Sequence, residues 1–197
     1  MNIRENFLRA AEMDGPEWIP CCVILTPLLW HKYRERLEDL VISYPQIFGA
    51  YEKGSRDFDD FGFRTRGKKY VDEWGCVWFF LKDGLQGQVV KHPLSNWSAL
   101  KNYKPPDPVD IGAFPREGAP PSPTFEEAKK IIEERRAQGR LVTGWLPHGF
   151  LFQRLYYLRG FKNLMIDFLR EPPELQTLID MVVDFNLKIL DKWLELG

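Results

Sequence analysis

Two apolar runs, each followed by a helical pattern, restrict the folds open to this chain more than any other feature. The first, WIPCCVIL over residues 18–25, stands between turn residues and is nearly unbroken, which is typical of a strand buried on both faces. Thr26-Pro27 then predicts a helix start, with apolar spacing to about Ser43. The second run, RLVTGWL over residues 140–146, also precedes a helical segment. Strands joined through helices predict parallel pairing with right-handed crossovers.

Further helices are predicted from apolar spacing, capping residues and helix-ending residues. They cover residues 3–13, the short segment NWSALKNY, a segment opened by the capping box Thr124 to Glu127 and closed by Gly139, and two helices separated at EPP. The runs VDEWGCVWFF and GQVVKHPL predict a hairpin, because Asp83-Gly84 between them is a turn signal. Residues 49–70 and 104–123 are predicted to be long surface loops, and the second holds seven of the fifteen prolines.

The predicted architecture is α/β, with residues 1–197 forming one domain. A closed (β/α)₈ barrel typically takes about 250 residues. Two convincing parallel strands do not close such a barrel, so we expect a partial barrel that stops before closure. The last predicted helix is long and amphipathic, and the strand expected after it is missing.

Composition excludes several functional classes. The formal net charge of −1 creates no field that would attract nucleic acid or an anionic membrane. No apolar run approaches the roughly 20 residues of a membrane span, and the N-terminus carries acids where a signal peptide is apolar. Three cysteines make no disulfide framework. We therefore expect a cytoplasmic protein that binds neither nucleic acid nor membrane.

Residues able to bind a metal ion lack a recognisable spacing. Neither a C-x-x-C nor an H-E-x-x-H pattern occurs, and adjacent residues on a strand point to opposite faces. No metal site is therefore predicted within the chain. The soft or imidazole ligands that the chain offers are Cys21, Cys22, Cys76, His31, His92 and His148.

The segment DEWG is a candidate for acid–base chemistry. Asp72 stands two residues before Trp74, and a carboxyl group desolvated against indole acquires a pKa closer to neutrality. Asp72 is therefore a candidate catalytic residue, and Trp74 a candidate substrate contact. The alternative is a strand-entry turn with solvated acids and Trp74 in the core.

The loop GWLPHGF, residues 144–150, is a second candidate, because loops after parallel strands converge on the site in α/β folds. His148 is a candidate catalytic residue, since its imidazole titrates near neutrality. Trp145 is a candidate stacking surface, and Tyr156 or Tyr157 could supply a phenol. The alternative is that His148 only opens a helix and that the tyrosines belong to the core.

Taken in order, five blocks resemble the uroporphyrinogen decarboxylase superfamily, which contains porphyrinogen decarboxylases and corrinoid-dependent, zinc-containing methyltransferases. They are NFLRAAEMDGPEWIPC, VDEWGCVW, GQVVKHPLSNWSALKNYKPPDP, GWLPHGFLFQRLYYLRGFKNLMIDFLREPPELQTLID and FNLKILDKWLELG, and they run over nearly the whole chain. The family fold is a (β/α)₈ barrel. The resemblance implies that this chain corresponds to the N-terminal half of such a barrel or slightly more.

The resemblance implies one of two activities. In the methyltransferase branch, zinc activates a thiol that takes a methyl group from a corrinoid; its zinc ligands are expected beyond residue 197, and a corrinoid protein is an expected partner. In the decarboxylase branch the substrate is a tetrapyrrole and no metal or cofactor is needed. The decarboxylases' Arg-Gln-Ala-Gly-Arg stretch is replaced here by TPLLWHKYRER, which favours methyl transfer. A third possibility is a non-catalytic or truncated fragment, inactive alone.

Some residues carry over from the resemblance. Counting back from Gly160 places the decarboxylase tyrosine at Tyr156, a candidate catalytic residue. The family's catalytic aspartate follows the second strand, where SRDFDDFGFRTRG stands. Asp60 in this stretch is the candidate substrate contact, although acidic clusters in loops are usually solvated. A homodimer is also expected.

Overall fold

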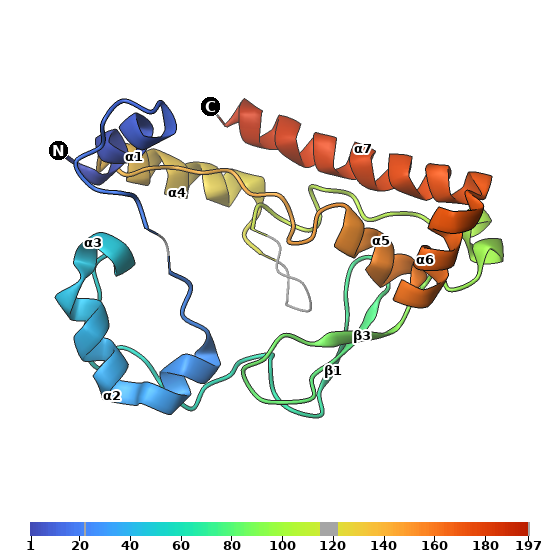
Figure 1. Cartoon of the computed structure of the whole chain (residues 1–197), viewed down its shortest axis with the longest axis horizontal. Helices are drawn as coiled ribbons and strands as arrows, with labels where there is room; N and C mark the ends of the chain where they lie inside the picture. The colour runs from blue at the N-terminus through green and yellow to red at the C-terminus, as the bar shows by residue number, and fades with distance from the viewer. Residues whose placement is uncertain (22, 115–121, 197) are drawn as a thin grey trace.

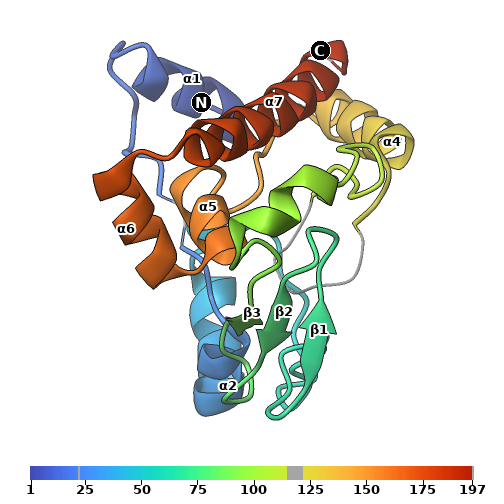
Figure 2. The ribbon, with the colours of Figure 1, turned by 90° about the vertical axis from the view of Figure 1, so that its right-hand side faces the viewer.

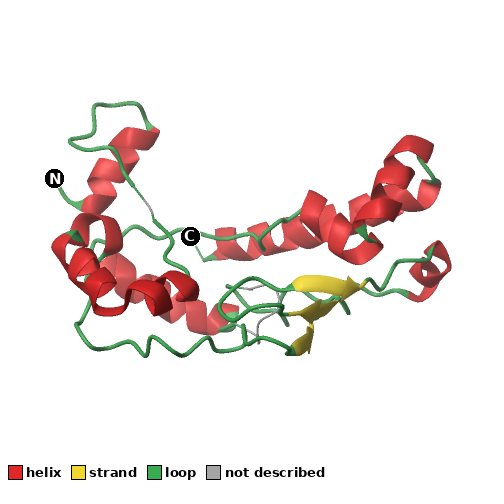
Figure 3. Cartoon of the chain, turned by 60° about the horizontal axis from the view of Figure 1, so that its bottom comes forward, coloured by secondary structure: helices red, strands yellow, loops and turns green. Residues whose placement is uncertain are grey.

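The computed structural model of the chain describes residues 1–21, 23–114 and 122–196. Helices make up most of the regular structure, beside one small sheet (Figure 3). In chain order the elements are α1 (Ile3–Ala11), α2 (Pro27–Ser43), α3 (Pro45–Phe48), β1 (Lys69–Val71), β2 (Val77–Phe79), β3 (Gln88–Lys91), the 3-10 helix η1 (Trp97–Asn102), α4 (Phe125–Ala137), α5 (Phe152–Arg159), α6 (Phe161–Arg170) and α7 (Pro173–Glu195).

The sheet is an antiparallel meander in the order β1-β2-β3. Tyr70 of β1 lies opposite Trp78 of β2, and Trp78 lies opposite Val89 of β3, with an irregularity between Val77 and Trp78. The hairpin predicted around Asp83-Gly84 is therefore confirmed. The inner face of the sheet packs on α5, where the rings of Trp78 and Tyr157 are 4.9 Å apart.

Two separate clusters of buried side chains hold the chain together. The larger one joins the sheet to α4, α5, α6 and α7, and its fully buried members include Trp78, Phe80, Leu158, Leu178 and Ile189. In both Figure 1 and Figure 2, α5 lies between α7 and the sheet. The smaller cluster is built on α2 from Trp30, Leu37 and Val41. Helices α2 and α3 lie apart from α5–α7 in Figure 1.

Local signals placed most of the helices correctly. Thr26 caps α2 and accepts a hydrogen bond from the Leu29 amide at 3.4 Å. The capping box of α4 is complete: the Thr124 amide donates to Glu127 at 2.8 Å, and the Glu127 amide donates to the Thr124 hydroxyl at 3.2 Å. Residues 49–68, 104–114 and 122–123 of the two predicted loops lie outside helices and strands, whereas Lys69 and Tyr70, at the end of the first predicted loop, belong to β1.

The prediction of a single helix ahead of EPP is wrong, because this segment forms two helices, α5 and α6. Gly160 separates α5 from α6 and has a φ of +84°, a left-handed conformation that favours glycine. A β-carbon at this position would lie 3.1 Å from Cδ2 of His92. Glycine therefore suits this break between the helices for two reasons. It adopts the left-handed conformation easily, and it has no β-carbon to crowd His92.

The two predicted parallel strands are not formed in the described chain, where every described residue of 18–25 and 140–146 lies outside helices and strands. Their backbones are held by side chains of helices instead. The Trp18 carbonyl accepts from Asn6 of α1 at 2.8 Å, and the Trp145 carbonyl accepts from the indole of Trp193 in α7 at 2.8 Å. A strand needs a neighbouring strand to satisfy its backbone groups, and within the described residues neither segment has one.

The unpaired segments leave large apolar side chains in solvent. Ile19 is 87% exposed, Ile24 is 79% exposed and Trp145 is 57% exposed. Ile19 and Ile24 belong to the run that the sequence predicted to be buried in a parallel sheet, and Trp145 is the residue proposed as a stacking surface. Among the described helices, none combines the length and the apolar character that a membrane crossing requires.

Candidate functional site

The predicted site residues fall in three different places. Asp72 and Trp74 are buried at the end of the sheet. Tyr156 is half-buried on α5, and Trp145 and His148 are exposed on the segment before that helix. Asp60 lies in the loop that follows α3.

The carboxylate of Asp72 is the centre of a buried polar cluster in the turn between β1 and β2. Its Oδ1 accepts from the Cys76 amide at 2.8 Å, and its Oδ2 accepts from the indole N–H of Trp78 at 2.8 Å. Arg154 of α5 completes the cluster, with Nη1 3.4 Å from Oδ2. The side chains of Arg154 and Asp72 are only 6% and 4% exposed. Asp72 thus joins the sheet to α5 through an ion pair.

Aromatic rings surround the guanidinium of Arg154. It lies 4.9 Å from the ring centre of Trp74 and 5.6 Å from that of Tyr157. Trp74 itself packs edge-on against Phe185 of α7 at 4.6 Å and is only 3% exposed. Trp74 therefore lies in the core, as one of the two sequence interpretations expected, whereas Asp72 is not a solvated turn residue.

Tyr103 extends the buried cluster and makes the stability of the fold depend on pH. Its hydroxyl donates to the Trp74 carbonyl at 2.8 Å. Burial, followed by the neighbouring Cys76 and Asp72, raises the pKa of Tyr103 above the ordinary 10.0. The folded protein therefore retains this proton at pH values where the unfolded chain loses it.

We expect the free energy of unfolding to fall as pH rises above about 10, by at most about 1.4 kcal/mol per pH unit for this one proton. Below the unfolded pKa the contribution is fully present. Urea denaturation between pH 8 and 11 measures the slope, and Tyr103→Phe should make it shallower. Tyr44→Phe, at an exposed tyrosine, is the control; an equal effect of the two substitutions would contradict the assignment.

Tyr156 faces the end of β3 and the beginning of α6. Its ring centre is 6.3 Å from that of His92 and 6.0 Å from that of Phe161. His92 is itself fixed, because its Nδ1 lies 2.8 Å from the Tyr157 carbonyl. Tyr157 is only 7% exposed and packs in the core. Of the two tyrosines proposed to supply a phenol, only Tyr156 borders the surface.

The segment before α5 packs against α4 and α7. The indole of Trp193 lies so close to Gly144 that an added β-carbon would be 2.9 Å from it. A hollow of about 340 Å³ opens beside this contact. Its lining residues are Ile132, Arg136, Val142, Gly144, Trp145, Leu146, Leu190, Trp193, Leu194 and Leu196. His148 lies in the turn beyond, exposed to solvent.

Asp60 belongs to an exposed turn. The ion pairs of this turn are made by the preceding residue, Asp59. Asp60 accepts from the Gly62 amide at 2.7 Å. Asp59 binds His31 at 2.9 Å and Arg34 at 3.0 Å, both on α2. Arg34 is the main cause that lowers the pKa of Asp59 below its ordinary value. These contacts attach the loop to α2.

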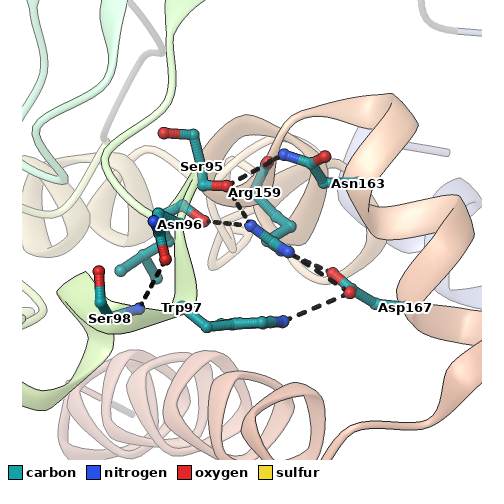
Figure 4. A network of polar contacts seen from close by, with 8 residues as sticks. Ser95, Asn96, Trp97, Ser98, Arg159, Asn163 and Asp167 are labelled. Atoms are coloured by element: carbon teal, nitrogen blue, oxygen red, sulfur yellow. Dashed lines mark hydrogen bonds and ion pairs between the residues drawn. The ribbon is translucent and has the colours of Figure 1, made fainter.

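A second buried ion pair, which the sequence reasoning missed, fixes η1 onto α5 and α6 (Figure 4). Nε of Arg159 lies 2.6 Å from Oδ2 of Asp167. The same guanidinium donates to the carbonyls of Leu94, at 2.9 Å, and Ser95. It also lies 4.2 Å from the ring centre of Trp97, whose indole donates to Asp167 at 3.3 Å.

The sequence does carry a signal for both ion pairs. In FQRLYYLR, the arginines at 154 and 159 stand among apolar residues of a short helix, only five positions apart. A charged residue on an apolar helix requires a buried partner. The partners Asp72 and Asp167 cannot be assigned without the tertiary structure.

A zinc site does not fit the residues that the structure describes. Among them there is no group of three or more His, Cys, Asp or Glu placed to hold a metal ion. Cys21 is exposed and Cys76 is buried in the core. Cys22 lies outside the described residues.

Comparison with models of protein families, with curated protein sequences and with solved structures finds no match to the chain.

Proposed function

We propose that this chain forms part of a barrel of the uroporphyrinogen decarboxylase type, in the methyltransferase-like branch, where a methyl group passes between a corrinoid and a thiol. The proposal of a barrel rests on one observation, the lack of strand pairing in residues 18–25 and 140–146. Both are apolar, both precede a helix, and neither is paired in the described chain. The choice of activity rests on the resemblance of the five sequence blocks. It also rests on the segment TPLLWHKYRER, which replaces the Arg-Gln-Ala-Gly-Arg stretch of the decarboxylases.

Pairing with further strands would remove the exposed apolar surface of both segments. Each residue in an extended strand has one backbone donor and one acceptor, and a parallel neighbour satisfies them. Burying side chains such as Ile19 and Ile24 would contribute about 1.5–3 kcal/mol each. The strands needed for this are proposed to come from outside residues 1–197.

The proposed substrate region is the rim formed by the ends of the two proposed strands and the segments that follow them. Trp145 and His148 belong to this rim, and in barrel enzymes such loops surround the substrate. Trp145 offers an exposed ring for stacking, and His148 offers an imidazole. Since the described residues do not fit zinc, we assign no reaction step to zinc here, and its ligands are proposed to lie outside them. The proposed location is the cytoplasm, with a corrinoid protein as partner and a homodimer as the assembly.

Decarboxylation of a porphyrinogen is the second candidate. The observation that favours it is the position of Tyr156, whose hydroxyl makes no hydrogen bond within the described part of the chain and is thus available to a substrate. The Asp72 carboxylate, in contrast, is already occupied by three donors.

Metal analysis of the full gene product, with the isolated 197-residue chain as the control, tests the methyl-transfer proposal. We expect about one zinc ion per full gene product and none in the control. The full product should also consume methylcobalamin when a thiol is supplied. A metal-free product that leaves methylcobalamin intact would contradict methyl transfer. A metal-free product that decarboxylates a porphyrinogen would establish the second candidate, and a product inactive in both assays would indicate a non-catalytic fragment.

A further inference from the structure

We infer that His92 and Tyr156 form a binding site for a small flat ring carrying an acidic hydroxyl, with His92 as the proton acceptor and Tyr156 as a hydrogen-bond donor. The site lies at the end of β3, where α5 meets α6. It requires neither a corrinoid nor a metal, so it stands apart from the proposed methyl transfer.

The first support is the fixed tautomer of His92. A backbone carbonyl only accepts hydrogen bonds, so the contact of 2.8 Å to the Tyr157 carbonyl places the proton on Nδ1. Neutral His92 therefore has its lone pair on Nε2. Within the described residues, Nε2 has no donor. The imidazole is thus oriented by its Nδ1, and its Nε2 carries an acceptor lone pair.

The second support is the surrounding wall. Tyr156 lies beside His92, with its ring tilted by 46° to the imidazole. Phe161 stands edge-on to Tyr156 and is 57% exposed, so a flat ligand has an aromatic surface to pack against. Gly160 lets the imidazole edge approach the backbone, since a β-carbon there would meet Cδ2 at 3.1 Å.

These groups define the chemistry of the ligand. A hydroxyl bound to Nε2 transfers its proton to that nitrogen, which produces an imidazolium and a phenolate, and the reverse transfer restores both neutral groups. The Tyr156 hydroxyl can donate to the phenolate oxygen while this charge exists. No other reactant is needed. A ring without an acidic hydroxyl lacks the contact to Nε2.

Nitrogen NMR of the 197-residue chain tests the tautomer. For the neutral imidazole, we expect Nδ1 of His92 to have the shift of a protonated nitrogen and Nε2 that of an unprotonated one. The opposite assignment would overturn the inference, because Nε2 would then be a donor.

Ligand titration tests the site, with 4-nitrophenol as the probe and 4-nitroanisole, which lacks the hydroxyl, as the matched control. We expect saturable shifts of His92 and Tyr156 with 4-nitrophenol, and binding of 4-nitroanisole weaker by about tenfold. The variant His92→Asn places an amide nitrogen near the position of Nδ1, so it keeps the contact to Tyr157 and removes Nε2. It should weaken 4-nitrophenol to the level of 4-nitroanisole, while Tyr156→Phe should weaken it severalfold.

His31→Asn is the protein control, because His31 lies on α2 in an exposed pair with Asp59. It should leave the affinity for 4-nitrophenol unchanged. Equal binding of the two ligands, equal binding by the native chain and His92→Asn, or no saturable binding by the native chain would each overturn the inference. Because the assay contains no corrinoid, zinc or thiol, its failure leaves the methyl-transfer test intact.

Discussion

Asp72→Asn should lower the free energy of unfolding by about 3–5 kcal/mol, the usual cost of removing one partner of a buried ion pair. The substitution keeps the shape of the side chain but removes the charge that faces Arg154. An amide nitrogen also cannot accept from the indole of Trp78, which now donates to Oδ2 at 2.8 Å. Urea denaturation followed by circular dichroism measures the change.

Glu73→Gln, one residue along, is the matched control for Asp72→Asn. Glu73 is exposed and accepts from the hydroxyl of Tyr70 at 3.1 Å, so its replacement should change the stability by less than about 0.5 kcal/mol. The double variant Asp72→Asn with Arg154→Met should recover part of the loss, because it removes both charges. A loss below about 1 kcal/mol for Asp72→Asn would show that the carboxylate is not a structural partner of Arg154.

Arg159→Met should have a similar effect, about 3–5 kcal/mol, because it leaves the buried carboxylate of Asp167 without its ion-pair partner. It also takes a donor away from the carbonyls of Leu94 and Ser95. Since both carbonyls directly precede η1, we expect this helix to loosen more than the rest of the chain. Urea denaturation gives the total change, and hydrogen exchange of residues 94–102 gives the local one.

Arg170→Met is the control for Arg159→Met, since Arg170 is exposed at the end of α6. It should change the stability by less than about 0.5 kcal/mol. Comparable losses in the two variants would contradict the account of the Arg159 network. So would a large loss in Arg159→Met with unchanged exchange across η1.

The features that the sequence predicted correctly depend on residues close together in the chain. Thr124 and Glu127 are three residues apart and specify the start of α4 without help from elsewhere. Asp83-Gly84 likewise specifies a local turn between two strands. In such cases the interacting groups are already neighbours before the chain folds, so the pattern alone is sufficient.

The features that the sequence did not predict depend on distant partners. Residues 18–25 have the composition of a buried strand, but a strand forms only beside another strand. Arg154 and Asp72 are 82 positions apart, and nothing in the sequence pairs them. The environment of Asp72 was accordingly only partly predicted: its burial was one of two interpretations, whereas its partners, the indole of Trp78 and the guanidinium of Arg154, were not predicted.

Hydrogen–deuterium exchange across residues 18–25 and 140–146, compared between this chain and a full product extended through the gene's downstream codons, tests the proposed barrel most directly. In the isolated 197-residue chain, where no described residue of either segment is paired, the amides should exchange rapidly. In the full product the account predicts strong protection of both segments, comparable to that of β2. Rapid exchange of both segments in the full product would contradict the barrel, and with it the assignment of these residues to its strands.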